Sequence, residues 1–127
     1  MAMCPMRDCR IAGCPRDYEG HATVTEESVS AQDTCPFCSP PAKRIFYEDK
    51  RVFGVWDQFP VTPGHALLVP RRHVATWFDA SSLEKSALTE SIDHAKVAIE
   101  RQHSPDGYNI GINAGAAAGQ TIYHLHI

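Results

Sequence analysis

The last seven residues constrain the fold of this chain more than any other segment, because polar and apolar side chains alternate along them. Tyr123, Leu125 and Ile127 alternate with His124 and His126. Successive side chains of a β-strand point to opposite faces, so both imidazoles would project from one face and the apolar side chains from the other. Imidazole can act as a nucleophile, a proton donor or a metal ligand near neutral pH. The pattern therefore predicts a half-buried strand that presents two chemically active side chains.

The composition favours one soluble domain. The 127 residues are 43% hydrophobic and 21% charged, an ordinary balance for a globular protein with a core. A formal net charge of −3 gives no general attraction to a nucleic acid polymer or an anionic membrane, so a phosphate ligand would have to be held locally. The chain has no run of about 18 apolar residues and no signal-peptide core at its N-terminus, so we expect a cytoplasmic protein without a membrane span.

Residues 1–33 show no periodicity, and we expect them to form a poorly ordered N-terminal extension before a domain at 34–127. Cys4, Cys9 and Cys14 lie at five-residue intervals, which favours free thiols over a small metal knuckle. Five cysteines without an export signal argue against a disulfide framework.

The remaining sequence predicts strands, one long helix and further strands. Ser81 and Glu84 form a capping-box pattern at the start of the helix, and apolar residues then follow at helical spacing. Such an order favours an α+β fold in which a helix covers an antiparallel sheet. The expected elements are a hairpin of strands 44–48 and 52–56, a buried central strand 65–69, a helix 81–103, and strands 108–113 and 121–127 around a tight loop at 114–119.

Three segments together resemble the histidine-triad (HIT) family of nucleotide hydrolases and transferases. They are residues 63–73, 113–115 and 118–127. The family signature is His-φ-His-φ-His-φ-φ, where φ is apolar, and its first four positions match His124-Leu125-His126-Ile127. The resemblance covers about residues 34–127. It implies a HIT-like fold with an antiparallel sheet of about five strands, one long helix and a short helix. Because the third histidine is absent, we expect a domain that lacks its C-terminal end.

The resemblance also implies a reaction. In the family the middle histidine of the motif attacks an α-phosphorus and forms a nucleotidyl-histidine, and this role maps onto His126. His65 would lie beside it in the active-site histidine cluster. The implied substrates are purine nucleoside phosphoramidates or dinucleoside polyphosphates. The alternatives are a non-catalytic nucleotide-binding or zinc-containing module and an inactive truncated fragment.

The resemblance implies that some nucleotide-binding residues precede the expected helix in the sequence and others follow it. Asp57 would bind the ribose hydroxyls, and Asn113, Gly119 and Thr121 would surround the phosphate. Gln120 belongs to the same group, although it is better suited to organise the loop. Phe53 and Val55 are candidates for the base pocket, with Phe46, Phe59 and Trp56 as rivals. Arg71 and Arg72 would attract a polyphosphate or form a solvated turn.

The pair Cys35-x-x-Cys38 has the spacing of a zinc knuckle. In bacterial relatives two histidines complete such a site, and here they would be His73 and His124. The zinc would be structural and would pin the knuckle to the sheet. Family members usually form two-fold dimers, so the resemblance also implies a homodimer.

Overall fold

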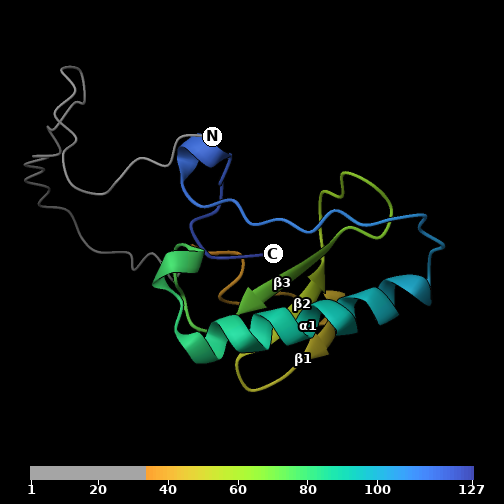
Figure 1. The fold of residues 1–127 in the computed structure, drawn as a ribbon, viewed down its shortest axis with the longest axis horizontal. Helices are drawn as coiled ribbons and strands as arrows, with labels where there is room; N and C mark the ends of the chain where they lie inside the picture. Colours follow the sequence, from red (N-terminus) through yellow and green to blue (C-terminus); the bar gives the residue numbers. More distant parts are fainter. Residues whose placement is uncertain (1–33) are drawn as a thin grey trace, which may run out of the picture.

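The computed structural model describes residues 34–127, which form a small α+β unit (Figure 1). The predicted extension at 1–33, including Cys4, Cys9 and Cys14, lies outside the described residues. The sheet contains β1 (Ile45–Glu48), β2 (Val52–Trp56) and β3 (Ala66–Pro70). One long helix, α1 (Ser82–Glu100), follows the sheet in sequence. Three single-turn 3₁₀ helices, η1 (Ala42–Arg44), η2 (Trp77–Asp79) and η3 (Ala116–Ala118), complete the described elements.

The predicted hairpin is confirmed. Strands β1 and β2 pair antiparallel, and β2 pairs antiparallel with β3 over five residue pairs from Val52–Pro70 to Trp56–Ala66. Asp49 closes the hairpin turn, because its Oδ1 accepts the backbone N–H groups of Arg51 at 2.6 Å and Val52 at 2.7 Å. An acidic side chain that bonds the backbone two or three residues ahead is a common way to fix a turn.

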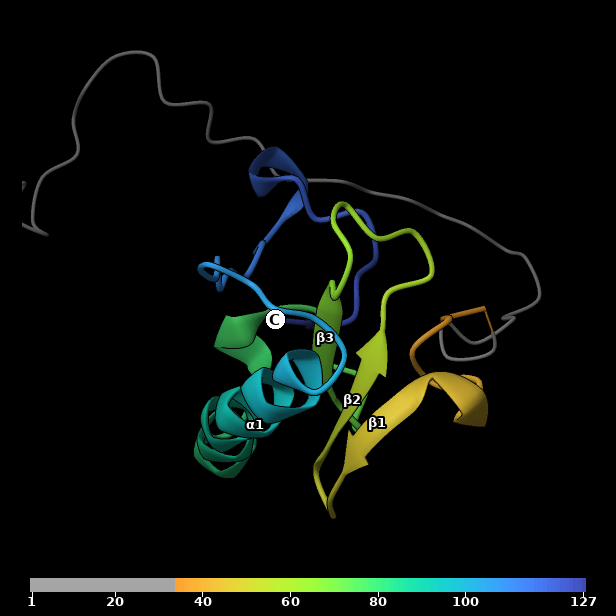
Figure 2. The same ribbon diagram turned by 90° about the vertical axis from the view of Figure 1, so that its right-hand side faces the viewer.

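Both faces of the sheet are buried, by different parts of the chain. On one face, Val52 and Leu68 pack with Leu88 and Ala95 of α1. On the other face, side chains that alternate with these in β2 and β3 form a second apolar cluster (Phe53, Val55, Leu67 and Val69, with Phe37 against them). Figure 2 shows α1 along one side of the strands and the residues just after 34 on the other. The residues around Phe37 therefore form one wall of the fold.

The helix begins as the sequence predicts. Ser81 is its N-cap, its Oγ accepts the N–H of Glu84 at 3.2 Å, and the Glu84 side chain reaches back to the Ser81 N–H. This capping box satisfies two backbone donors that the first turn would leave free. Arg72 Nε donates to Glu84 Oε1 at 2.7 Å and so ties the segment after β3 to the start of α1.

The number of strands differs from the prediction, because residues 108–113 and 121–127 are not strands in the described structure. Residues 108–113 are mostly exposed and make no backbone hydrogen bond to the sheet within residues 34–127. Ile127 exchanges two 2.9 Å hydrogen bonds with Leu68, and the Leu125 N–H donates to Val74 at 2.7 Å. These few contacts hold the segment beside β3 without forming a continuous ladder. In the three-stranded sheet the central strand is β2, and the predicted central strand, β3, is buried beside it. Among the described helices, none is long and apolar enough to cross a bilayer.

Candidate functional site

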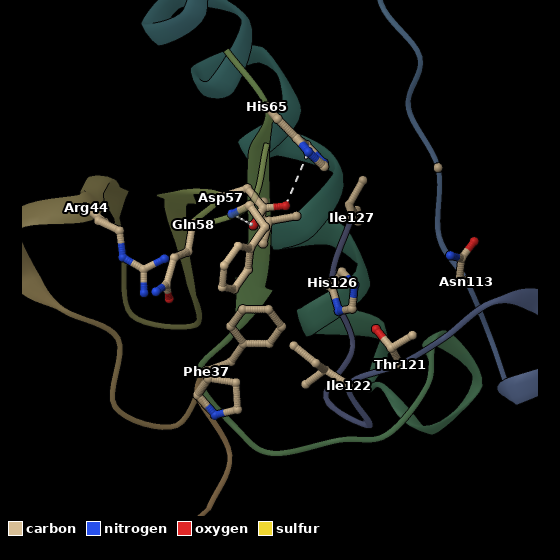
Figure 3. Close-up of a pocket in the computed structure, with 14 residues that line it drawn as sticks. Phe37, Arg44, Asp57, Gln58, His65, Asn113, Thr121, Ile122, His126 and Ile127 are labelled. Atoms are coloured by element: carbon tan, nitrogen blue, oxygen red, sulfur yellow. Dashed lines mark hydrogen bonds and ion pairs between the residues drawn. The ribbon is translucent and has the colours of Figure 1, made fainter. Parts of the chain in front are cut away.

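A cavity of about 520 Å³ opens between the β2–β3 loop, the C-terminal segment and the residues around Phe37 (Figure 3). Five side chains that the sequence assigns to catalysis or nucleotide binding line it, although they are as many as 69 positions apart. They are Asp57, His65, Asn113, Thr121 and His126. The structure therefore brings most of the predicted site together in one place.

His126 has a defined tautomer. Its Nδ1 lies 2.8 Å from the backbone oxygen of His124. A carbonyl oxygen can only accept a hydrogen bond, so Nδ1 carries a proton, and in the neutral ring the lone pair is on Nε2. The imidazole is half-buried and its ring lies 5.2 Å from the ring of Phe37, centroid to centroid, at 61°. This environment fixes the orientation of the imidazole at the wall of the cavity.

Asp57 and His65 stand at the two ends of the β2–β3 loop and contact each other across it. His65 Nδ1 lies 3.2 Å from Asp57 Oδ2 and 3.2 Å from the backbone nitrogen of Val61. The other carboxylate oxygen, Oδ1, accepts the N–H of Phe59 at 3.0 Å. These contacts set the course of the loop and hold a carboxylate and an imidazole at the cavity wall.

Eight further residues line the cavity that the sequence reasoning did not assign to it, and they include Phe37, Arg44 and Gln58. Arg44 Nη1 donates to the backbone oxygen of Trp56 at 3.4 Å, which brings a guanidinium to the mouth of the cavity. Phe37 lies between the two cysteines of the knuckle, and this position was the available signal for it. Nothing local in the sequence distinguishes Arg44 from an ordinary surface arginine.

Gly119 and Gln120 do not line the cavity. Gly119 has a left-handed backbone (φ 88°), and a Cβ there would lie 3.5 Å from the amide nitrogen of Asn113. Gln120 is buried, and its amide forms hydrogen bonds with the backbone of its own loop and of the segment after β3. Its Oε1 accepts the Gly115 N–H at 2.8 Å, and its Nε2 donates to Ala75 at 2.6 Å and to Ile122 at 3.1 Å. The side chain therefore organises the loop that carries Thr121.

Other candidates are used elsewhere. Phe53 and Val55 belong to the buried cluster beneath the site, whereas Phe59 lines the cavity. Arg71 pairs with Glu48 at 2.8 Å and Arg72 pairs with Glu84, so both guanidinium groups are engaged away from the cavity wall.

A second group of side chains lies beside the cavity. One ligand atom each from Cys35, Cys38, His73 and His124 falls within 4.8 Å of all the others. His73 Nδ1 lies 3.2 Å from the Cys38 sulfur, and His124 Nδ1 lies 3.4 Å from the Cys35 sulfur. A tetrahedral zinc ion with bonds of about 2.0–2.3 Å needs ligand atoms roughly 3.3–3.8 Å apart. The cluster therefore already has nearly the spacing of a four-coordinate metal site.

The protonation of His124 suits a ligand. Its Nε2 donates to the backbone oxygen of Pro70 at 2.7 Å, so the lone pair is on Nδ1, which faces the two sulfur atoms. Burial lowers the pKa of His124 and keeps the imidazole neutral. Burial also raises the pKa of Cys38, with the neighbouring Cys35 adding to the effect, and a bound cation would favour the Cys38 thiolate. The donor set and its geometry fit a divalent metal such as zinc.

Comparison with known proteins places these residues in a wider group. The family model described as "HIT domain" matches residues 41–127. An adenylylsulfatase of Arabidopsis thaliana, HINT3, is 33% identical over 131 residues, which cover 97% of this chain and 64% of that protein. An AP-4-A phosphorylase of Mycobacterium tuberculosis is 35% identical over 118 residues, 87% of this chain and 60% of its own length. The chain thus spans less than two thirds of either protein.

A solved structure of a zinc-bound histidine triad family protein from Mycobacterium smegmatis superposes with a TM-score of 0.66. It is 30% identical, and the match covers 75% of this chain and 72% of that one. The α+β arrangement of sheet and long helix expected from the sequence is therefore confirmed at the level of the family fold.

Proposed function

Because the chain belongs to the HIT family, we propose that it is a nucleotide hydrolase or transferase that acts at the α-phosphorus through a nucleotidyl-histidine. The observation that carries this proposal is the environment of His126. Its Nδ1–H is held by the His124 carbonyl, and its Nε2 makes no hydrogen bond within residues 34–127, at the wall of a cavity that also holds a carboxylate and an amide. The relatives named as an adenylylsulfatase and an AP-4-A phosphorylase support the reaction class.

The reaction would proceed in two displacements. His126 Nε2 attacks the α-phosphorus, a P–N bond forms, and the bond to the leaving group breaks with its electron pair going to that group. Water or another acceptor then attacks the same phosphorus, and Nε2 departs with the electrons of the P–N bond. With water, the product is a nucleoside monophosphate and the water proton passes to solvent.

The other cavity residues would bind the substrate. The Asp57 carboxylate can accept hydrogen bonds from two ribose hydroxyls. The Asn113 amide and the Thr121 hydroxyl can donate to phosphate oxygens, where charge develops in the transition state. Gln120 would support Thr121 through the loop. The proposed substrates are purine nucleoside phosphoramidates or dinucleoside polyphosphates.

We propose a structural zinc ion held by Cys35, Cys38, His73 and His124. When bound, the ion would cross-link the residues around Phe37 to the C-terminal segment and hold both sulfur atoms as thiolates. The account predicts one zinc ion per chain by elemental analysis, and loss of that zinc in Cys38→Ser. A wild-type chain that binds no zinc under reducing conditions would contradict the site. Reduced cysteines also fit the expected cytoplasmic location.

The expected homodimer remains a proposal. Val97 on α1 and Ile110 in the following segment are large apolar side chains that stay exposed within the described chain. Burial of such side chains is typical of a two-fold interface. Light scattering should give twice the chain mass, and Ile110→Lys should reduce it toward the monomer; a monomeric wild type would contradict the proposal.

Release of AMP from adenosine 5′-phosphoramidate tests the proposed activity. Removal of a covalent nucleophile costs on the order of 10⁴-fold or more in turnover, and His126→Ala should show such a loss. His94→Ala is a matched control, because His94 is exposed on α1 and stacks on Tyr47 away from the cavity. Equal turnover in wild type and His126→Ala would contradict the assignment. Binding of AMP without any turnover would favour the alternative of a non-catalytic nucleotide-binding module.

A further inference from the structure

We infer that metal binding at the Cys35–Cys38 turn controls the affinity of the neighbouring cavity for nucleotide, with Phe37 as the positioning residue that connects the two. This inference rests on the proposed function, because it assigns a regulatory link to the same cavity. It goes beyond a structural role for the metal, since it predicts that the two ligands change each other's affinity.

The turn has two functions in one short segment. Its first and last residues, Cys35 and Cys38, supply two of the four ligand atoms of the cluster. The two residues between them, Pro36 and Phe37, line the cavity. The turn has one backbone hydrogen bond of its own, from the Cys38 N–H to the Cys35 oxygen at 3.2 Å. Its position therefore depends on what its side chains contact.

Phe37 connects the turn to the proposed nucleophile. The side chain is only 8% exposed and packs on Phe53 and Leu67 of the second apolar cluster. Its ring meets the His126 ring edge-on at 5.2 Å and the His124 ring at 5.9 Å. A shift of the turn by a fraction of this distance would open the cavity wall beside His126 and remove the ring against which the imidazole rests.

His124 provides a second connection. Its Nδ1 belongs to the cluster of four side chains, whereas its backbone oxygen accepts a hydrogen bond from His126 Nδ1. A metal ion would therefore fix the nucleophile from two sides, through the ring of Phe37 and through the carbonyl of His124. Without the ion, the turn is held by the packing of Phe37 and by thiol–imidazole contacts, which are weaker than metal–ligand bonds.

The physical consequence is a coupling free energy. A nucleotide that binds to the metal-free chain must itself order the turn and the His126 imidazole, and that ordering reduces the net binding free energy. Such couplings between two sites typically change affinity by about 5- to 150-fold, and linkage makes them reciprocal. We expect about a tenfold effect, because one short turn and one side chain are ordered.

Calorimetric titration of the full chain with AMP tests the coupling. The zinc-loaded chain should bind AMP about tenfold more tightly than the same chain stripped with a chelator and shown by circular dichroism to be folded. In Phe37→Ala the ratio of the two affinities should fall clearly below that of wild type, because only the connection through the His124 carbonyl remains. Phe59→Ala is the matched control, because Phe59 lines the same cavity from the β2–β3 loop and is not part of the turn. Its affinities can fall, but their tenfold ratio should remain.

Cobalt substitution gives a second readout that does not need a metal-free fold. The visible absorption of Co²⁺ bound to thiolates reports on the geometry of the cluster, and it should change when AMP saturates the wild-type chain. Phe37→Ala should show a smaller change, and a change as large as that of wild type would contradict the role of Phe37. Equal AMP affinity of the zinc-loaded and stripped folded chains, or an unchanged Co²⁺ spectrum at saturating AMP, would overturn the coupling. Failure of zinc-loaded wild type to bind AMP at all would instead contradict the proposed function.

Discussion

Replacement of Gln120 by alanine should destabilise the fold far more than its position in a loop suggests. The side chain is 4% exposed and makes three hydrogen bonds, all to backbone groups. Two of the partners, Gly115 and Ile122, belong to its own loop, and the third, Ala75, lies two residues after His73. The amide therefore joins the loop that carries Thr121 to the segment that carries His73.

The magnitude follows from the number of bonds lost. Each hydrogen bond of this kind contributes about 1 kcal/mol net, and a partner left buried without water costs about 1–3 kcal/mol. All three backbone partners are themselves only half-buried, so water can reach some of them and the lower value applies. Gln120→Ala should therefore lower the free energy of unfolding by about 3 kcal/mol, three bonds at roughly 1 kcal/mol each.

Urea denaturation of the full chain measures this loss. Gln102→Ala is the matched control, because Gln102 is exposed just after α1 and should change stability by less than about 0.5 kcal/mol. In Gln120→Glu one acceptor is kept, but a carboxylate oxygen faces two carbonyl oxygens, so this variant should be at least as unstable. If Gln120→Ala were as stable as Gln102→Ala and bound nucleotide more weakly, Gln120 would not organise the loop. Its side chain would then bind the nucleotide directly.

Two further predictions concern stability alone. The hydrogen bond from Arg72 lowers the pKa of Glu84. The stability that this ion pair contributes is therefore present above the unfolded carboxyl pKa of about 4.3 and is lost as the pH falls through the lower folded value. Glu84→Gln should flatten the acid side of the curve of unfolding free energy against pH, and an unchanged slope would contradict this. A Cβ at Gly54 would lie 2.6 Å from a ring carbon of Phe46, so Gly54→Ala should cost about 1–3 kcal/mol. Gly107→Ala, where a Cβ meets nothing within 4 Å, should cost less than half as much in the same urea titration, and equal losses would refute the steric argument.

Local sequence patterns correctly predicted the helix start and the buried strand, because both are determined by residues close together in the chain. The capping box at Ser81 and Glu84 marked the start of α1, and the apolar run before Pro70 marked a buried strand. Both signals arise from hydrogen bonds and burial within a few residues of the chain. The segment 108–113 has the same strand-like composition, but a strand also needs a partner edge, and no local pattern specifies one.

Some residues of the candidate site could be predicted from the sequence, and others are recognised only in the folded structure. The residues of the motif and of the Cys35-x-x-Cys38 pair could be named from spacing, and the structure brings Cys35, Cys38, His73 and His124 together. Arg44 and Phe37 reach the cavity only because the chain folds around the sheet, so their positions depend on tertiary contacts. Gln120 is the opposite case, because its sequence position beside the motif suggests a binding residue, whereas its side chain forms hydrogen bonds with backbone groups.

Detection of a covalent intermediate on His126 would test the proposed nucleotidyl-histidine mechanism directly. The full chain would be mixed rapidly with adenosine 5′-phosphoramidate, quenched at alkaline pH to preserve a phosphorus–nitrogen bond, and analysed by mass spectrometry. We expect an added adenylyl group in the peptide that contains His126, its absence in His126→Ala and its presence in His94→Ala. An adenylyl group on another residue, or AMP release at the wild-type rate by His126→Ala, would contradict the central claim.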